Sequence, residues 1–327
     1  MMKKKYFRKA ILTNGLIVGV LTMVLLTSCN QDSPSKKTPE TTVSPETTMT
    51  SENMTTPDTK INLEFTKETY PRVDGSTATI PLSESMAAKL LSLSEEEATS
   101  FIKHNTTHNA YVNLLDGKAD IIFVTEPSEE ELQMAKEKGI ELEVVPVVKE
   151  AFVFLLNKEN PVEKISVKQI QDIYQGKIKN WKELGGPDEE ILAYQRPTNS
   201  GSQTIMENQV MKGLKMAEAP TEMKPQEMSG LVEVIASYDN SDRAIGYSVY
   251  YYANSMYSKN TIKFVKVDGI EPNNQNISSG AYPFTSAYYA VLKKDEPVDS
   301  NARKLLNWLL SEEGQKVAED SGYVKLK

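Results

Sequence analysis

The chain has 327 residues, of which 39% are hydrophobic, and it carries a formal net charge of −8 at pH 7. This length and apolar content are enough for a substantial buried core and favour more than one domain. The excess of acidic residues argues against a nucleic-acid partner, because nucleic acids are bound by clustered Lys and Arg. An acidic total does not exclude an anionic ligand, since a recessed site depends on the donors close to it.

Residues 1–28 have the pattern of an export signal, with five basic residues before a short apolar run at 17–26. The following segment, Leu26-Thr27-Ser28-Cys29, resembles a bacterial lipobox and contains the chain's single cysteine. The resemblance implies cleavage before Cys29 and attachment of lipid to it, the alternative being an incidental thiol. Removal of residues 1–28 would leave 32 basic against 45 acidic residues, a net charge of −13. No cysteine would then remain for a disulfide.

Residues 29–60 form a tract rich in Thr, Ser, Pro and Glu, with few large apolar side chains. Such a composition cannot bury enough surface to fold, so this tract is predicted to be a disordered tether.

Short apolar strand patterns alternate with amphipathic helix patterns from Ile61 to the C-terminus, which predicts an α/β architecture. Strands are expected at 119–124, 142–148, 151–156, 244–247, 262–267 and 288–292. Helices are expected at 83–93, 109–115, 128–138, 167–175, 203–214, 231–237 and 301–310.

Three polar clusters lie at the ends of these elements. Residues 74–81 place a glycine and several hydroxyls before a helix, which is typical of an anion site or of a simple capped turn. Residues 104–109 contain both histidines at i, i+4 spacing, but Asn105 stands where zinc-protease helices carry Glu, so a polar helix start is favoured over a metal site. Residues 120–127 form a strand that ends in Thr125-Glu126, and ligands usually bind at the carboxyl ends of strands in α/β sheets. A helix cap or a solvent position is the alternative for Glu126.

The most informative segment is 195–204, Gln-Arg-Pro-Thr-Asn-Ser-Gly-Ser-Gln-Thr. Arg196 offers a planar fork of donors that matches a tetrahedral oxyanion. Ser200, Gly201 and Ser202 come where a helix should begin, and the N–H groups of a helix N-terminus bind anions. An ordinary N-cap serine in a surface loop is the alternative.

Together these segments resemble the phosphate-binding lipoproteins of phosphate ABC importers, over about residues 61–327. Arg196 and Ser200-Gly201-Ser202 are similar to that family's Arg-x-x-x-Ser-Gly-Thr motif. Further similar segments are 173–181 with Gly185-Gly186, then 244–247 and 279–283. The resemblance implies a two-lobed type II periplasmic-binding-protein fold with a hinge and an interlobe ligand cleft. Lobe 1 would comprise 61–152 with 256–327, and lobe 2 would comprise 153–255, with chain crossings near 151–156 and after Tyr247.

The same resemblance implies which residues bind the ligand. The phosphate contacts would come from Ser76, Thr77, Thr107, Glu126, Arg196, Ser200, Gly201 and Ser202, with Thr79 as an alternative in the first segment. Glu126 stands at the place of a family aspartate. An ionised carboxylate only accepts hydrogen bonds, so Glu126 would favour hydrogenphosphate, which carries a proton, over sulfate, which carries none at neutral pH. Tyr174, Trp181 and Tyr282 would be scaffold residues packed in the core.

Two departures from the family pattern bear on Arg196. Thr198 stands where the family often has an aspartate that holds the arginine, and Asn199 replaces a glycine. Asn is tolerated in place of that glycine if the backbone is left-handed there.

We therefore expect a solute-binding lipoprotein, anchored by lipid on Cys29 to the extracytoplasmic face of the cell membrane, that delivers inorganic phosphate to an ABC transporter permease. No cofactor and no metal are expected. One alternative is the same fold acting as an oxyanion or phosphate sensor or adhesion lipoprotein without transport, or binding another tetrahedral oxyanion. A serine hydrolase using Ser200 or Ser202 would need a general base, and neither histidine lies in a segment expected to reach that loop.

Overall fold

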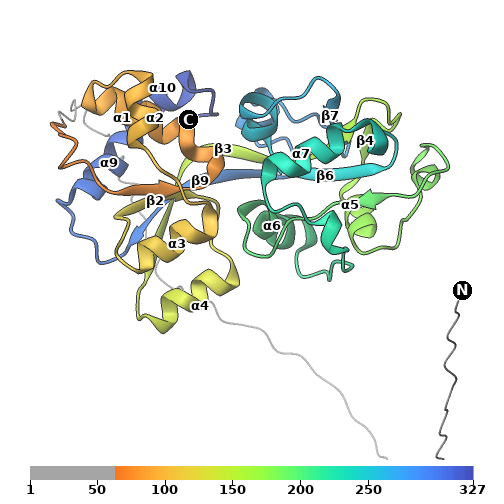
Figure 1. Ribbon diagram of the computed structural model, residues 1–327, viewed down its shortest axis with the longest axis horizontal. Coiled ribbons are helices and arrows are strands. Elements are labelled where there is room, and N and C mark those ends of the chain that lie inside the picture. Colours follow the sequence, from red (N-terminus) through yellow and green to blue (C-terminus); the bar gives the residue numbers. More distant parts are fainter. Residues whose placement is uncertain (1–62, 327) are drawn as a thin grey trace, which may run out of the picture. The chain divides into compact units, whose positions relative to one another are not determined.

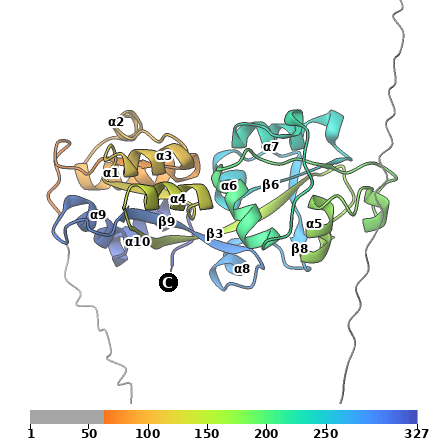
Figure 2. The ribbon, with the colours of Figure 1, turned by 90° about the horizontal axis from the view of Figure 1, so that it is seen from below.

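One long strand, β3 (Leu142–Asn157), connects two groups of elements. The computed structural model describes residues 63–326, which belong to one compact unit of the chain. The first part of β3 pairs with β9 (Thr285–Lys293), and its second part pairs with β6 (Ala244–Val249) and β7 (Ile262–Phe264). We call the elements around the first part lobe 1 and those around the second part lobe 2. Figures 1 and 2 show helices gathered beside each part, with β3 and β9 passing between the two groups.

Among residues 63–326, seven strands form one mixed sheet in the order β1-β2-β9-β3-β6-β5, with β7 also paired to β3. In lobe 1, β1 (Val73–Gly75) runs parallel to β2 (Ile121–Val124), and β2 is antiparallel to β9. In lobe 2, β5 (Leu192–Ala193) runs parallel to β6. A separate pair is formed by β4 (Lys164–Ile165) and β8 (Lys266–Val267).

The helices cover the faces of this sheet (Figure 1). Those of lobe 1 are α1 (Ile80–Leu91), α2 (Glu95–Phe101), α3 (Thr107–Leu115), α4 (Glu129–Glu137), α9 (Asn301–Leu309) and α10 (Glu312–Asp320). The helices that follow the first crossing are α5 (Val167–Tyr174), α6 (Gly201–Ile205), α7 (Met228–Ala236) and α8 (Asn274–Ser278). The segment α6 continues directly into η3 (Met206–Met211), a π-helical stretch. Among the described residues no helix is long and apolar enough to cross a membrane.

The core is continuous across the second part of β3. Phe152 and Phe154 pack against Tyr247 of β6, and Phe154 also contacts Tyr174 of α5. Such aromatic contacts contribute large buried areas and fix the packing of a core. The predicted scaffold residues Tyr174, Trp181 and Tyr282 are all buried.

Most predicted elements agree with the observed ones to within a few residues. The strand expected at 262–267 is two strands, β7 and β8, and the short elements α8, β4 and β5 were not predicted. Three further differences have local causes. The strands expected at 142–148 and 151–156 are one strand, whose register with β9 shifts between Pro146 and Val148 because proline has no N–H to donate. Two short helices, α2 and α10, were missed because their exposed faces carry mostly charged residues. The three-residue strand β1 is too short for an alternating pattern.

The lobe boundary also differs from the expected one. The prediction assigned residues 256–327 to lobe 1, but β7 pairs with the end of β3 in lobe 2, and β8 pairs with β4. The chain therefore returns to lobe 1 between β8 and β9, well after Tyr247. A strand pattern identifies residues 262–267 as extended but does not indicate which strand they pair with. The expected signal segment 1–28, Cys29 and the tether 29–60 lie outside the described residues.

Candidate functional site

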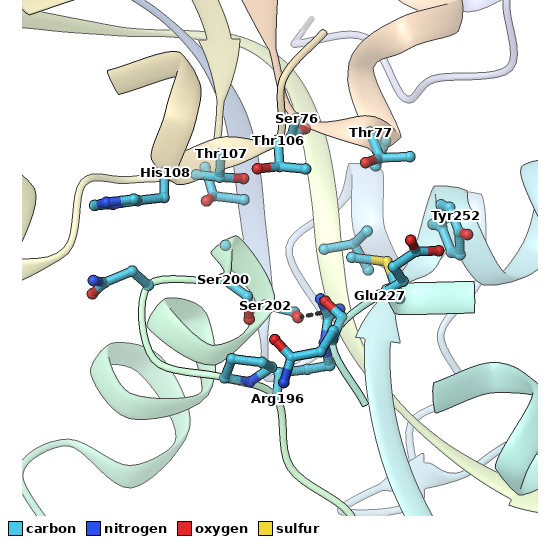
Figure 3. A pocket seen from close by; sticks show the side chains of 18 of the residues that line it. Ser76, Thr77, Thr106, Thr107, His108, Arg196, Ser200, Ser202, Glu227 and Tyr252 are labelled. Carbon is cyan, nitrogen blue, oxygen red and sulfur yellow. Dashed lines mark hydrogen bonds between the residues drawn. The ribbon is translucent and has the colours of Figure 1, made fainter. Parts of the chain in front are cut away.

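A cavity of about 450 Å³ lies between lobe 1 and lobe 2 (Figure 3). Its wall contains seven of the residues that the sequence assigned to ligand binding: Ser76, Thr77, Thr107, Arg196, Ser200, Gly201 and Ser202. Figure 3 shows Ser76, Thr77 and Thr107 on one side of the cavity, facing Ser200, Ser202 and Arg196 on the other. Segments more than a hundred residues apart in the chain thus meet at one polar site.

The first part of the lobe 1 wall follows β1. Ser76 is buried, and its backbone N–H donates to Phe123 O of the neighbouring strand β2 (2.9 Å). Thr79 does not line the cavity; its hydroxyl donates to the same carbonyl at 2.7 Å. Thr79 therefore braces the turn that presents Ser76 and Thr77, rather than facing a ligand itself.

Asp74 holds the second part of this wall. Its side chain is 3% exposed and accepts hydrogen bonds from Asn105 N (2.7 Å), Asn105 Nδ2 (2.9 Å) and Asn113 Nδ2 (2.7 Å). These bonds fix the loop that carries Thr106 and Thr107 to the end of β1. Because a buried carboxylate needs hydrogen-bond donors, these bonds favour the position in which the loop lies beside the end of β1.

The N-terminus of α3 opens onto the cavity. Thr107 is the first residue of α3, and the preceding Thr106, at φ 71°, makes no side-chain capping bond. The first N–H groups of an uncapped helix are free to bind an anion. Thr125, just after β2, lies beside them with a hydroxyl that is buried, lines the cavity and has no hydrogen-bond partner in the structure.

The lobe 2 wall is built by the start of α6. Ser200 is the N-cap, and its hydroxyl accepts from Gln203 N at 3.3 Å. Asn199 has φ 65°, which is the left-handed conformation in which Asn is tolerated in place of glycine. This turn brings Gly201 and Ser202, at the first positions of the helix, to the cavity.

Gly201 permits close contact between the two lobes. A Cβ atom at this position would lie 2.5 Å from Thr125 Oγ1 and 2.7 Å from Thr107 Oγ1, both in lobe 1. Asn199 also donates a hydrogen bond from its side chain to Glu130 of α4. On this side of the cavity the lobes are therefore already in contact, and only glycine fits between them.

Arg196 is held by main-chain acceptors. Its side chain donates from Nε to Pro225 O (3.0 Å) and from Nη2 to Gln226 O (2.8 Å), while Nη1 points at Ser202 Oγ (3.5 Å; Figure 3). Its backbone N–H donates to Tyr247 Oη at 2.9 Å. Burial of the guanidinium lowers the pKa of Arg196, although the group stays charged at neutral pH. Thr198 stands where the family often has an aspartate that holds the arginine; here the carbonyls of Pro225 and Gln226 hold Arg196 instead.

Glu126 is the one predicted ligand residue that is absent from the cavity wall. Its carboxylate accepts a hydrogen bond from the Tyr289 hydroxyl of β9 (2.8 Å). Successive side chains at the end of a strand point to opposite sides, so the turn that directs Thr125 into the cavity directs Glu126 away from it. The sequence placed Thr125 and Glu126 correctly at the end of β2, but it did not separate their directions.

Several lining residues were not among the predicted ligand contacts. Among them are the polar residues Thr106, His108, Thr125, Glu227, Ser229 and Tyr252. The strand-end pattern already indicated Thr125. Nothing in the local sequence marks Glu227, Ser229 or Tyr252, because they reach the cavity from segments that carry no glycine-hydroxyl pattern.

The two histidines have separate partners. His104 hydrogen bonds through Nδ1 to Ser76 O (2.8 Å) and through Nε2 to Ser83 Oγ (3.1 Å), whereas His108 Nδ1 lies 3.1 Å from Glu131 Oε1. Burial lowers the pKa of His104 and raises that of Glu131. Among residues 63–326 no group of three or more His, Cys, Asp and Glu side chains is arranged to hold a metal ion.

Comparison with known proteins adds to this geometry. Residues 52–313 match the family model of a PBP superfamily domain. A phosphate-binding protein PstS of Bacillus subtilis is 31% identical over 170 residues, which are 52% of this chain and 53% of that protein, so this match spans about half of each. The PstS of Staphylococcus saprophyticus is 25% identical over 264 residues, covering 77% of this chain and 79% of that protein.

Solved structures show the same architecture. A candidate phosphate ABC transporter substrate-binding protein of Clostridium perfringens, solved with bound phosphate, has a TM-score of 0.58 and 25% identity and covers 78% of this chain and 98% of that one. An ABC-type phosphate transport receptor of Vibrio cholerae has a TM-score of 0.57 and 21% identity, covering 77% of this chain and 98% of that one. These likenesses confirm the expected two-lobed α/β fold class.

Proposed function

The chain belongs to the PBP superfamily, and we propose that it binds inorganic phosphate between its lobes and delivers it to an ABC importer. One observation carries this proposal: the Arg196 fork, hydroxyls from both lobes and the N-termini of α3 and α6 border a single cavity. Each of these groups donates hydrogen bonds or attracts negative charge, so together they suit a tetrahedral oxyanion. The relatives named phosphate-binding protein support phosphate as the oxyanion.

The guanidinium of Arg196 is oriented by its neighbours and keeps its charge available for an anion. Its Nε and Nη2 atoms are occupied by neutral carbonyl groups, which orient the fork without neutralising its charge. Nη1 is directed toward Ser202 and the cavity. An anion that enters would therefore gain a charge-assisted hydrogen bond, which is about twice as strong as a neutral one.

Because the donors come from both lobes, a bound anion would stabilise the arrangement in which the lobes are closed. We place the crossings of this hinge in β3 and in the segment between β8 and β9. The remaining parts of the proposal are delivery of phosphate to a permease and anchoring to the extracytoplasmic membrane face through lipid on Cys29.

We further propose binding without catalysis. The Ser200 hydroxyl caps α6, and the Ser202 hydroxyl accepts from Arg196. The imidazoles of His104 and His108 hydrogen bond to other groups, so their bonds do not activate either serine as a nucleophile.

Calorimetric titration of the purified protein with phosphate tests the proposal. We expect phosphate to bind the unmodified protein, and Arg196→Ala to weaken that binding on the order of 100-fold, since a hydrogen bond to a charged group contributes about 1.5–3 kcal/mol. Arg243→Ala is the matched control. Arg243 makes its side-chain bond to Asp239 O, outside the cavity, so its removal should change affinity less than about twofold. Equal affinities for Arg196→Ala and the unmodified protein would reject the site.

A further inference from the structure

Glu227 supplies the one carboxylate among the described residues that line the cavity. It is the residue immediately before α7, yet its side chain makes no capping bond to that helix. Its Oε2 accepts from Ser229 Oγ at 3.3 Å, which leaves further acceptor positions free. Figure 3 shows Glu227 beside Tyr252, on the same side of the cavity as Arg196.

The same short segment positions both charges of the site. The carbonyls of Pro225 and Gln226 hold the Arg196 guanidinium, and Glu227 follows directly in the chain. Burial lowers the pKa of Arg196, and the charge of Glu227 opposes that shift only in small part, after Tyr247 and Tyr252. The backbone before Glu227 is therefore held against the Arg196 guanidinium, and both side chains line the same cavity that would hold the ligand.

The polar groups that line the cavity differ in what they can offer an anion. The hydroxyls of Thr107, Thr125, Ser202 and Tyr252 can donate, and so can the guanidinium of Arg196. An ionised carboxylate only accepts. A fully deprotonated oxyanion would thus be satisfied at every group except Glu227, where two acceptors would face each other.

We propose that Glu227 is the specificity-determining residue that selects a protonated tetrahedral oxyanion, such as hydrogenphosphate, over sulfate. This inference rests on the proposed phosphate-binding function and deepens it. The sequence suggested this role for Glu126 of lobe 1. The Glu126 carboxylate instead accepts from Tyr289 and does not line the cavity, so we assign the role to Glu227 of lobe 2. The ligand proton pairs with Glu227, while the remaining oxygens accept from the surrounding donors.

The test compares Glu227→Gln with the matched variant Glu126→Gln by calorimetric titration with phosphate and with sulfate. Both changes remove one negative charge and keep the side-chain size, and the amide can donate where the carboxylate could not. For Glu227→Gln we expect the ratio of phosphate to sulfate affinity to fall about tenfold or more, because sulfate then meets a donor. For Glu126→Gln we expect that ratio to stay within about twofold.

The dependence of the affinity ratio on salt concentration distinguishes a direct contact between Glu227 and the ligand from a long-range effect of its charge. Glu227 is exposed in this structure, and the field of an exposed charge is screened within about 10 Å at 0.1 M ionic strength. A contact with the ligand proton should keep the change in ratio at both about 0.05 M and about 0.5 M sodium chloride. Loss of the effect at the higher concentration would overturn the inference.

The results also separate this inference from the function on which it rests. An unchanged ratio in Glu227→Gln, or a narrowed ratio in Glu126→Gln, would overturn the role of Glu227 alone, provided that the unmodified protein binds phosphate. Absence of phosphate binding in the unmodified protein would overturn the proposed function together with the inference.

Discussion

Gly201 lies directly against the hydroxyl of Thr125, so that a methyl group at position 201 would stand 2.5 Å from Thr125 Oγ1. The two residues belong to different lobes and form part of the same cavity wall. The absence of a side chain at Gly201 therefore allows the two lobes to come into contact at this point. It lets the N-terminus of α6 reach the hydroxyls of lobe 1, so one anion can contact both.

Gly201→Ala tests this contact. Its Cβ cannot fit between Thr107 and Thr125 unless the lobes move apart, so we expect phosphate affinity to fall tenfold or more while the free energy of unfolding changes little. The control is Gly230→Ala in α7, where a Cβ would meet Pro225 Cβ at 3.4 Å, an ordinary contact. Gly230→Ala should keep the affinity and stabilise the helix by up to about 1 kcal/mol. Titration together with denaturant unfolding measures both quantities, and retained affinity in Gly201→Ala would contradict the model of a shared wall.

The unpaired hydroxyl of Thr125 makes a second prediction. This side chain is only 3% exposed and has no hydrogen-bond partner, which costs about 1–3 kcal/mol for a buried polar group. Thr125→Val removes the hydroxyl and keeps the shape, so stability should stay the same or rise while phosphate affinity falls several-fold.

Thr79→Val provides the comparison for that experiment. The Thr79 hydroxyl is buried and donates to Phe123 O at 2.7 Å, and this carbonyl also accepts from Ser76 N at 2.9 Å. Thr79→Val therefore removes one buried hydrogen bond and should destabilise the fold by about 1 kcal/mol. Thermal and denaturant unfolding should therefore show changes in the free energy of unfolding that differ in sign or size between Thr125→Val and Thr79→Val. A Thr125→Val protein as destabilised as Thr79→Val would show that the Thr125 hydroxyl already has a structural partner.

Glu150 makes the stability of the fold depend on pH. This residue of β3 is 3% exposed and accepts from Ala151 N (2.8 Å) and Tyr251 N (3.2 Å). Burial raises the pKa of Glu150 to about 7 from an ordinary value of 4.5. Because the folded state favours the protonated carboxyl, the contribution of Glu150 to stability is fully present below about pH 4.5 and is lost as the pH rises to 7.

That contribution amounts to about 3 kcal/mol for a pKa difference of this size. Glu150→Gln can keep the accepting oxygen without titrating, so it should remove this part of the pH dependence. Denaturant unfolding of both proteins at about pH 5 and about pH 8 measures this pH dependence. Relative to the unmodified protein, the free energy of unfolding of Glu150→Gln should be higher at about pH 8 than at about pH 5. An equal difference between the two proteins at both pH values would refute the assignment to Glu150.

The site was predictable from sequence where its signals are local. The Ser200-Gly201-Ser202 turn before a helix, the Arg196 fork four residues before Ser200, and Ser76 and Thr77 after β1 are signals of a few adjacent residues, and all of them reach the cavity. The left-handed backbone at Asn199 is consistent with the sequence, because Asn stands where the family has a glycine and is one of the few other residues that tolerate this conformation.

The features that the sequence could not reveal depend on long-range packing. Whether Thr125 or Glu126 faces the cavity depends on how β2 turns after Val124 beside Tyr289, which local residue types do not determine. Glu227 lines the cavity next to two carbonyls that accept from Arg196, which lies about thirty residues earlier in the chain. The pairing of β7 with β3 likewise joins residues about a hundred positions apart, so the lobe boundary was placed too early.

A crystal structure of the protein with phosphate at neutral pH tests the central claim most directly. We predict one phosphate in the interlobe cavity, with an oxygen about 3 Å from Arg196 Nη1 and another within hydrogen-bond distance of the Ser202 backbone N–H. Phosphate bound elsewhere, or a cavity that stays empty at millimolar phosphate, would contradict the account.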